Sequence, residues 1–452
     1  MGINRGDVIE LKLDDLANGG DSIGRYQGLA VFVPGGVPGE LVRARILAKK
    51  RNYARGELLE IIKRADSRIE PECSVFEDCG GCQLQHIEYE TQLEYKQKMV
   101  QDLLERVAKL KGIKVKPTLP AEYPFAYRNK AQFPLGKDQE GKIVGGFYRR
   151  GSHQLIPGDD CLIQHPLINR VMKKTLEILN DYQLSVYDEK KHKGLLRHLF
   201  IRVGVCTNQA LLVPVTQKEE FPYLKEIAAR LNKAVPEIVG IIQNINPERG
   251  NVITGKKYKT ITGQDYYIDY IGNIKFLISA RSFFQVNTLQ AKKLYDFVRE
   301  FAGLSGQEIL IDAYCGIGSI SLYLAGRAGE IIGIEEIPEA VEDAVKNAEL
   351  NGIENCRFIK GLVEEKLPEL IAEGIEPDLL LFDPPRKGLA KGVIKTAKVV
   401  KPKKIIYVSC NPATLARDLK LFKEDYDIIE VQVVDMFPHT YHVETVCLLE
   451  RK

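Results

Sequence analysis

The sequence predicts an α/β protein with three parts: a small N-terminal β-barrel, a mixed α+β central region and a C-terminal doubly wound parallel sheet. Residues 1–62 hold short apolar or alternating segments, such as DVIELKL at 7–13, which glycine turns separate. After about residue 280, apolar runs such as EILIDAY (308–314) and KIIYVSC (404–410) alternate with helical patterns. Such alternation is typical of a parallel sheet with helices on both faces.

The composition excludes several classes of protein. The chain has 452 residues, of which 44% are hydrophobic and 28% are charged, so it is not a wholly disordered protein. Apolar runs fall short of the ~18 residues that a membrane helix requires, and the N-terminus lacks an apolar signal core. We therefore expect a soluble, cytoplasmic protein with no membrane partner. Nine cysteines are too few for a disulfide scaffold and should be free, metal-bound or catalytic.

Basic residues gather in three segments although the net charge is only +3. The segments are 43–55, 127–150 and 190–202, and the first and second also contain aromatic residues. A charge run is usually a solvated face, and for the first segment that interpretation stays open beside RNA binding. The segregation of charge into three places favours a polyanionic partner.

An amphipathic helix is expected at residues 91–112 of the central region. Apolar residues recur there at helical spacing, and Gly112 is the predicted stop signal. From about 113 to 270 the sequence predicts short strands and proline-containing turns.

The segment DAYCGIGS (312–319) follows an apolar run and precedes a helical pattern. Gly316 and Gly318 allow a tight turn and a close approach of the backbone to a ligand. Glu335 ends the next expected strand, 19 residues after Gly316, where an acidic residue commonly holds ribose hydroxyls. Ser321 replaces the third glycine of a dinucleotide loop, and the acidic start of the motif disfavours a phosphate. A plain strand–turn–helix corner is the alternative, but the combination favours S-adenosylmethionine.

Cys410 ends another run, in VSCNP, directly before a helical pattern. A buried structural cysteine is the ordinary alternative. The start of a helix instead predicts a thiol whose pKa is lowered towards that of a nucleophilic thiolate. Asp383 ends the neighbouring run in DPPR, and Glu444 precedes the last apolar strand, where a proton-transfer group would be needed.

The combination of a thiol and a carboxylate indicates methylation at carbon. DPPR resembles a turn of amino-group methyltransferases, but Arg386 replaces the aromatic residue that would stack on the target base. C5 of uracil becomes nucleophilic when a thiolate adds to C6, and a base must then remove the C5 proton. The sequence supplies a candidate for the thiol, the base and the methyl donor.

Three cysteines of the central region, Cys73, Cys79 and Cys82, have the spacing C-x5-C-x2-C, and Cys161 follows in GDDCLIQHP. Four thiolates suit structural zinc or an iron–sulfur cluster. Zinc sites more often pair two C-x2-C units, so the three-plus-one arrangement favours [4Fe–4S], with zinc left open.

These motifs together resemble the RNA uracil-C5 methyltransferases that use S-adenosylmethionine, and within them the bacterial 23S ribosomal RNA branch with a TRAM domain and an iron–sulfur cluster. The resemblance covers essentially the whole chain, and DAYCGIGS, DPPR, SCNPATLARD and MFPHTYHVE follow in the family's order. It implies a TRAM barrel at 1–62, a central RNA-binding domain with [4Fe–4S] cysteines at 63–275 and a Rossmann-like catalytic domain at 276–452. Part of 90–120 is expected to pack with the catalytic domain.

The resemblance also implies roles for single residues. Cys410 is the implied nucleophile, and Glu444 is the implied base for the C5 proton. The implied S-adenosylmethionine site consists of Gln285 in FFQVN, Tyr314, Glu335 and Asp383. The implied cluster ligands are Cys73, Cys79, Cys82 and Cys161.

We therefore expect an enzyme that makes 5-methyluridine at a specific uridine of 23S rRNA through a covalent adduct between Cys410 and C6 of the base. A tRNA 5-methyluridine methyltransferase is the alternative with the same chemistry. A non-catalytic RNA-binding iron–sulfur protein is the alternative from another class, and the pair of Cys410 and Glu444 argues against it. We expect a monomer that needs no obligatory protein partner.

Overall fold

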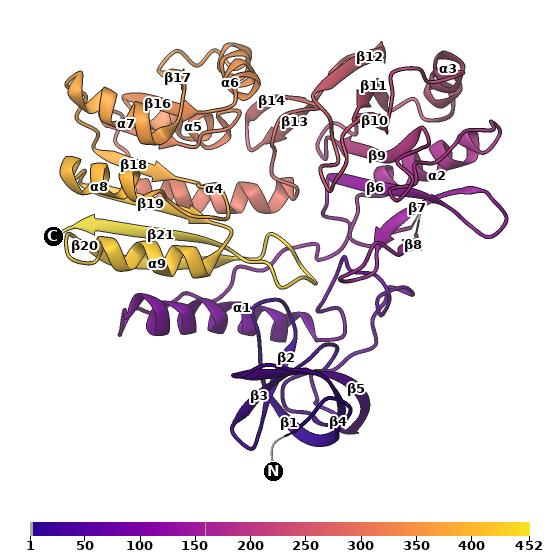
Figure 1. The fold of residues 1–452 in the computed structure, drawn as a ribbon. Coiled ribbons are helices and arrows are strands. Elements are labelled where there is room, and N and C mark those ends of the chain that lie inside the picture. Colours follow the sequence, from indigo (N-terminus) through magenta and orange to yellow (C-terminus); the bar gives the residue numbers. More distant parts are fainter. Residues whose placement is uncertain (1–2, 159) are drawn as a thin grey trace.

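The computed structural model describes residues 3–158 and 160–452 of the protein. Its strands form a closed barrel, two seven-stranded sheets and a two-stranded hairpin. The barrel, the central sheet and the C-terminal sheet occupy three regions of the molecule, and helix α1 (Tyr89–Leu103) lies between the barrel and the C-terminal sheet (Figure 1). Among the described helices, none is long and apolar enough to cross a membrane.

The N-terminal barrel has five strands in the order β1-β2-β3-β5-β4. Alternate residues of its strands point inward, as in β4, where Val42, Ala44 and Ile46 are buried. The predicted barrel is confirmed, although the reasoning from sequence missed β2. The strands are β1 (Val8–Leu16), β2 (Ser22–Tyr26), β3 (Leu29–Val33), β4 (Leu41–Lys49) and β5 (Tyr53–Lys63).

The first basic segment, residues 43–55, has one part whose side chains form ion pairs and another part whose side chains are exposed. Arg43 contacts Glu10 and Glu60, and Arg45 contacts Glu57, on the neighbouring strands. Lys49, Lys50, Arg51 and Arg55 are exposed around Tyr53, and no ion pair within the described ranges involves them. The half near the turn between β4 and β5 is therefore the half that can meet a polyanion.

Helix α1 (Tyr89–Leu103) continues as the π-helical turn η1 (Leu104–Ala108). The C-cap of the helix is Lys109, whose left-handed conformation, with a φ of +57°, prevents the helix from continuing. The predicted stop at Gly112 is therefore three residues too late. Val100, Leu104 and Ala108 of its buried face pack in one core with the C-terminal sheet. Beyond the helix, the backbone N–H groups of Lys116 and Leu119 donate to Val431 and Val433, so the segment runs along the edge of that sheet.

The central sheet has the strand order β12-β11-β10-β9-β6-β7-β8. One face shares a core with α2 and α3, and the other shares a core with the β13–β14 hairpin and the C-terminal sheet. The boundary expected between residues 275 and 276 falls inside β14. The elements are β6 (Lys130–Lys137), β7 (Ile143–Tyr148), β8 (Leu155–Pro157), α2 (Pro166–Leu179), β9 (Leu196–Val203), β10 (Ala210–Thr216), α3 (Leu224–Ala234), β11 (Ile238–Ile245), β12 (Lys257–Gly263), β13 (Tyr266–Ile271) and β14 (Ile274–Ser279).

The third basic segment is only partly at the surface: Lys190, Lys191 and Lys193 are exposed, whereas its interpretation as a surface patch is wrong for two other residues. Arg197 and Arg202, both on β9, are only 4% and 3% exposed. Arg197 stacks on the Tyr187 ring and donates to backbone carbonyls, and Arg202 donates to the Ser282 carbonyl. Burial is possible because backbone oxygens and rings solvate these guanidinium groups.

The C-terminal sheet has the order β17-β16-β15-β18-β19-β21-β20, which confirms the predicted doubly wound sheet. Its first five strands are parallel, and β21 runs antiparallel to both β19 and β20. The elements are α4 (Thr288–Ala302), β15 (Ile309–Ala313), α5 (Ser319–Leu324), η2 (Ala325–Arg327), β16 (Glu330–Glu335), α6 (Pro338–Leu350), β17 (Cys356–Lys360), α7 (Val363–Ala372), β18 (Leu379–Phe382), α8 (Lys391–Val400), β19 (Lys404–Ser409), α9 (Pro412–Phe422), β20 (Tyr426–Val434) and β21 (Glu444–Arg451).

Candidate active site

A cavity of 540 Å³ lies where the parallel strands of the C-terminal sheet end. This edge is where ligands of doubly wound sheets bind, and the volume suits a small molecule. Every residue that the sequence assigned to catalysis or to S-adenosylmethionine lines this one cavity: Gln285, Tyr314, Glu335, Asp383, Cys410 and Glu444.

At one end of the cavity, the glycine-containing turn after β15 lies against the Glu335 carboxylate. Tyr314, Gly316 and Gly318 all have positive φ, and a Cβ on Gly318 would lie 2.8 Å from the Phe358 ring. Glu335, at the end of β16, accepts hydrogen bonds from the backbone N–H groups of Gly316 at 3.0 Å and of Ile337 at 2.9 Å. The carboxylate is therefore held at the glycine turn, where it can also accept from ribose hydroxyls.

Cys410 and Glu444 are brought together by strand register. β19 pairs with β21 so that Ser409 lies opposite Thr445, and the Thr445 hydroxyl donates to the Ser409 carbonyl at 3.1 Å. The next step of this antiparallel register sets Cys410 opposite Glu444, and directly opposed side chains have Cβ atoms about 5 Å apart. The thiol, directly after β19, and the carboxyl group, at the start of β21, thus both line the cavity, close enough for Glu444 to raise the pKa of Cys410.

Carboxyl groups dominate the electrostatics of the cavity. Burial, and then the nearby Asp312, raises the pKa of Asp383 to about 7. Burial also raises the pKa of Glu444 well above its ordinary value; Asp383 adds to the rise, whereas Arg386 opposes it. A ligand with a positive charge would relieve this concentration of acidic groups, so the cavity suits a sulfonium better than a phosphate.

The expectation of a lowered thiol pKa is wrong for the protein without ligands. Burial, followed by the charges of Glu444 and Asp383, raises the pKa of Cys410 to about 12, and Arg386 only partly offsets them. The start of α9 at Pro412 does not compensate for two carboxyl groups close to the sulfur. Cys410 is therefore a thiol until further positive charge enters the cavity.

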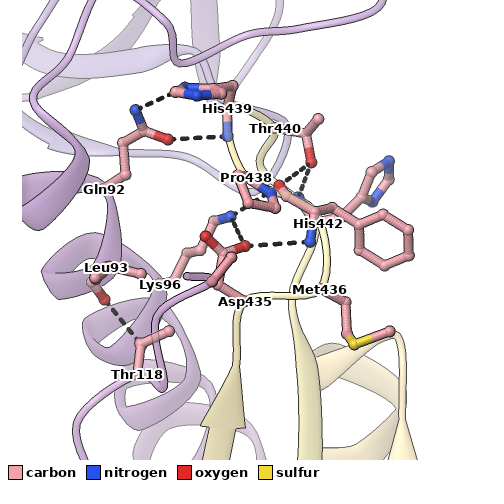
Figure 2. A network of polar contacts seen from close by, with 12 residues as sticks. Gln92, Leu93, Lys96, Thr118, Asp435, Met436, Pro438, His439, Thr440 and His442 are labelled. Atoms are coloured by element: carbon pink, nitrogen blue, oxygen red, sulfur yellow. Dashed lines mark hydrogen bonds and ion pairs between the residues drawn. The ribbon is translucent and has the colours of Figure 1, made fainter. Parts of the chain in front are cut away.

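The loop between β20 and β21, residues 435–443, also contributes to the cavity through Phe437 and His442. Figure 2 shows this loop against α1, whose Gln92 and Lys96 reach its polar groups. The reasoning from sequence missed both helix residues because it followed apolar residues only. The available signal was their spacing, since Gln92 and Lys96 continue the buried row of Val100 at intervals of four.

A second cavity, of 620 Å³, lies in the central region, and Cys73, Cys79, Cys82 and Cys161 all line it. Burial raises the pKa of Cys82 to about 12 and that of Cys161 to about 11. Arg128 and Lys130 line the same cavity.

The fit of a metal to this cavity depends on the kind of metal group. Within residues 3–158 and 160–452, no three His, Cys, Asp or Glu side chains are placed as a single metal ion would require. Four thiols around one cavity, with Arg128 and Lys130 beside them, are nevertheless the kind and number of donors that an anionic iron–sulfur cluster would require.

Two known families match the chain. The model of the tRNA (Uracil-5-)-methyltransferase family matches residues 88–452, and the TRAM domain model matches residues 3–59. An uncharacterized RNA methyltransferase of Halalkalibacterium halodurans is 46% identical over 451 residues, which span 100% of this chain and 98% of that protein. Another, of Caldanaerobacter subterraneus, is 44% identical over 447 residues, which span 99% and 98%.

Solved structures agree with these relatives. The tRNA (uracil-54, C5)-methyltransferase of Pyrococcus abyssi, in complex with S-adenosyl-L-homocysteine, superposes with a TM-score of 0.80 at 28% identity. The match covers 97% of this chain and 99% of the Pyrococcus chain, so it includes the barrel, the central region and the catalytic sheet. The chain therefore carries a TRAM domain and belongs to the tRNA (uracil-5-)-methyltransferase family of RNA methyltransferases.

Proposed function

We propose that this protein methylates C5 of a uridine in 23S ribosomal RNA, with S-adenosylmethionine as methyl donor and a transient bond between the Cys410 sulfur and C6 of uracil. The observation that carries the proposal is the juxtaposition of Cys410 and Glu444 across β19 and β21. C5 and C6 are adjacent ring atoms, so a nucleophile for one and a base for the other must be neighbours.

S-adenosylmethionine, when bound, supplies the methyl group that C5 takes up and the positive charge of its sulfonium. Glu335 would hold the ribose hydroxyls, and Gln285, Tyr314 and Asp383, which line the same cavity, would contact the rest of the donor. The S-adenosyl-L-homocysteine in the Pyrococcus abyssi structure supports this assignment, because it is what remains of the donor after methyl transfer.

Two residues of this chain carry the covalent steps. The Cys410 thiolate forms a bond to C6 while the C5–C6 π pair moves to C5, which then accepts the methyl group. The Glu444 carboxylate next takes the C5 proton, the C–H electron pair restores the C5–C6 double bond, and the C6–S bond breaks to return the thiolate. Arg386, which lowers the pKa of Cys410, assists by favouring the ionised sulfur.

The uracil must leave its RNA stack to reach these groups. The exposed Arg386 lies at the cavity, and Phe437 and His442 supply rings at its wall. The exposed basic residues near the turn between β4 and β5 give the barrel a surface for the RNA backbone.

A tRNA uridine is the second candidate substrate. The Pyrococcus abyssi enzyme that matches almost the whole chain acts on tRNA, according to its name. The proposal that ribosomal RNA is the substrate rests on the resemblance to the 23S branch. The features on which this resemblance depends are the barrel and the four cysteines.

Covalent trapping tests the roles of Cys410 and Glu444. With S-adenosylmethionine and RNA that contains 5-fluorouridine, we expect an adduct that survives denaturing electrophoresis, because Glu444 cannot remove fluorine as a cation. Cys410→Ala should form none, whereas Cys356→Ala, on β17, should form it normally. Glu444→Gln should add to ordinary RNA but turn over ~10²–10⁴-fold more slowly. An adduct with Cys410→Ala, or full turnover with Glu444→Gln, would contradict the mechanism.

The pH dependence of kcat/KM tests the interaction between Glu444 and Asp383. Glu444 must be ionised to act as a base, and its pKa is raised by burial and by Asp383, so the rate should fall with acidification well above pH 4.5. Asp383→Asn removes a negative charge and should move this acid limb to lower pH, even where the overall rate drops. If the acid limb of the pH profile stays in place or moves to higher pH in Asp383→Asn, Asp383 does not raise the pKa of Glu444.

The cysteine cavity is proposed to hold a [4Fe–4S] cluster. Protein purified without oxygen should be brown and contain about four irons per chain. Cys82→Ser should lose the visible absorbance, whereas Cys206→Ser should keep it, because Cys206 lies outside the cavity. Colourless, iron-free wild-type protein from anaerobic cells would rule the cluster out.

Mapping of 5-methyluridine decides between the two RNA substrates. Deletion of the gene should remove the modification from 23S rRNA at one or more uridines and leave tRNA unchanged, and the wild-type gene should restore it while the Cys410→Ala gene should not. Loss from tRNA alone would identify the second candidate as the correct substrate.

A further inference from the structure

Glu444 lies where a loop meets the C-terminal sheet: its backbone pairs with Val434 of β20, and the loop directly precedes it. Residues 435–443 connect β20 to β21, and Glu444 is the first residue of β21. Phe437 and His442 of the loop line the same cavity as Glu444. A shift of the loop would therefore change the surroundings of the carboxyl group and the space in which its side chain is oriented.

Lys96 of α1 holds the start of this loop at two points. Its ammonium group contacts Asp435 Oδ1 at 2.6 Å and donates to the Phe437 carbonyl at 3.1 Å. Both charged side chains are buried, with exposed fractions of 2% for Lys96 and 0% for Asp435. The other carboxylate oxygen of Asp435 accepts from the Tyr89 hydroxyl at 2.9 Å, so two side chains of α1 bind this carboxylate.

Gln92, one turn before Lys96, holds the middle of the loop. Its side-chain oxygen accepts from the His439 backbone N–H at 3.1 Å, and its amide nitrogen lies 3.3 Å from His439 Nδ1. His439 has a φ of +64°, a left-handed conformation that a residue with a Cβ adopts at a cost. Stacking on Phe125 and hydrogen bonds from Gln83 and Leu84 to the His439 carbonyl fix it further.

Stability alone does not account for the buried pair of Lys96 and Asp435. Removing two charges from water costs about as much as their attraction returns, and apolar side chains of similar size are often as stable. The rest of the row, from Val100 to Ala108, is apolar and packs against the sheet. Within this buried row, Lys96 is the charged residue, and it lies where the helix meets the loop. Its contacts there restrain the backbone of the loop to one conformation.

We propose that Lys96 is a positioning residue for proton removal: by holding Asp435 and the Phe437 carbonyl, it fixes loop 435–443 so that Glu444 faces C5 of the bound uracil. This inference rests on the proposed function and assigns to α1 a part in one step of it. Lys96 does not line the cavity, and Cys410 follows β19, a strand that Lys96 does not contact, so we expect formation of the C6–S bond to depend on Lys96 less than proton removal does.

The test compares Lys96→Met with Lys116→Met. Lys116 follows α1 and pairs with Glu430 on β20, but it is 47% exposed and remote from the loop contacts. Lys96→Met should lower kcat by ~10²-fold, as expected for a misplacement of about 1 Å, with KM for S-adenosylmethionine changed less than ~2-fold. It should still form the adduct with 5-fluorouridine RNA at the wild-type rate. Lys116→Met should match wild type in all of these measurements.

An isotope effect separates positioning from a general loss of structure. With RNA that carries deuterium at C5 of uridine, Lys96→Met should show a larger primary isotope effect on kcat than wild type, because proton removal has become rate-limiting. A variant that was merely partly unfolded would lose adduct formation and turnover in equal proportion, without a change in the isotope effect. That result, or equality of Lys96→Met and Lys116→Met, would overturn the inference.

Tyr89→Phe keeps the test decisive if Lys96→Met does not fold. It removes the hydroxyl that donates to Asp435 and accepts from the Ala121 backbone N–H, and it should give a smaller loss of kcat with the same rise in the isotope effect. An unchanged isotope effect in folded Tyr89→Phe would then overturn the inference. Failure of the proposed function is distinguishable, because wild type itself would then make no 5-methyluridine.

Discussion

The pairing of β19 with β21 is the constraint on which the active site depends. Neither strand carries a complete site: β19 leads to the thiol, and β21 begins with the carboxyl group. Their register sets Ser409 against Thr445 and makes Cys410 and Glu444 the next pair. Because side chains alternate between the faces of a strand, a shift of one residue would turn the Glu444 carboxyl group to the opposite face of the sheet. The antiparallel insertion of β21 between β19 and β20 is thus a requirement of the chemistry.

The charges of the site impose an order on the reaction. In the absence of ligands, Asp383, Glu444 and the Cys410 thiol all have raised pKa values, so the cavity holds protons that the reaction needs to lose. A cationic donor favours the ionised forms of all three groups. Donor binding is therefore coupled to the release of protons from these groups. Arg386 contributes in the same direction, because its positive charge lowers the pKa of Cys410.

Much of this arrangement could be predicted from the sequence, because strand ends and glycine turns leave local signals. The doubly wound sheet and the barrel follow from such signals, and the spacing of the cysteines predicted the group of four that lines one cavity. Long-range packing leaves no such local signal in the sequence. The burial of Arg197 and Arg202 is an example, because it depends on backbone carbonyls and rings that come together only in the folded protein. The thiol pKa was predicted in the wrong direction because the helix start is visible in the sequence, whereas the two carboxyl groups near Cys410 come from other strands.

Tryptic mass spectrometry of protein trapped on RNA that contains 5-fluorouridine would locate the covalent bond between protein and base. Cleavage after Lys404 and Arg417 yields a peptide, residues 405–417, in which Cys410 is the sole cysteine. The account predicts that this peptide carries the nucleotide with one added methyl group. A nucleotide attached to any other peptide, or attached here without the methyl group in the presence of S-adenosylmethionine, would contradict it.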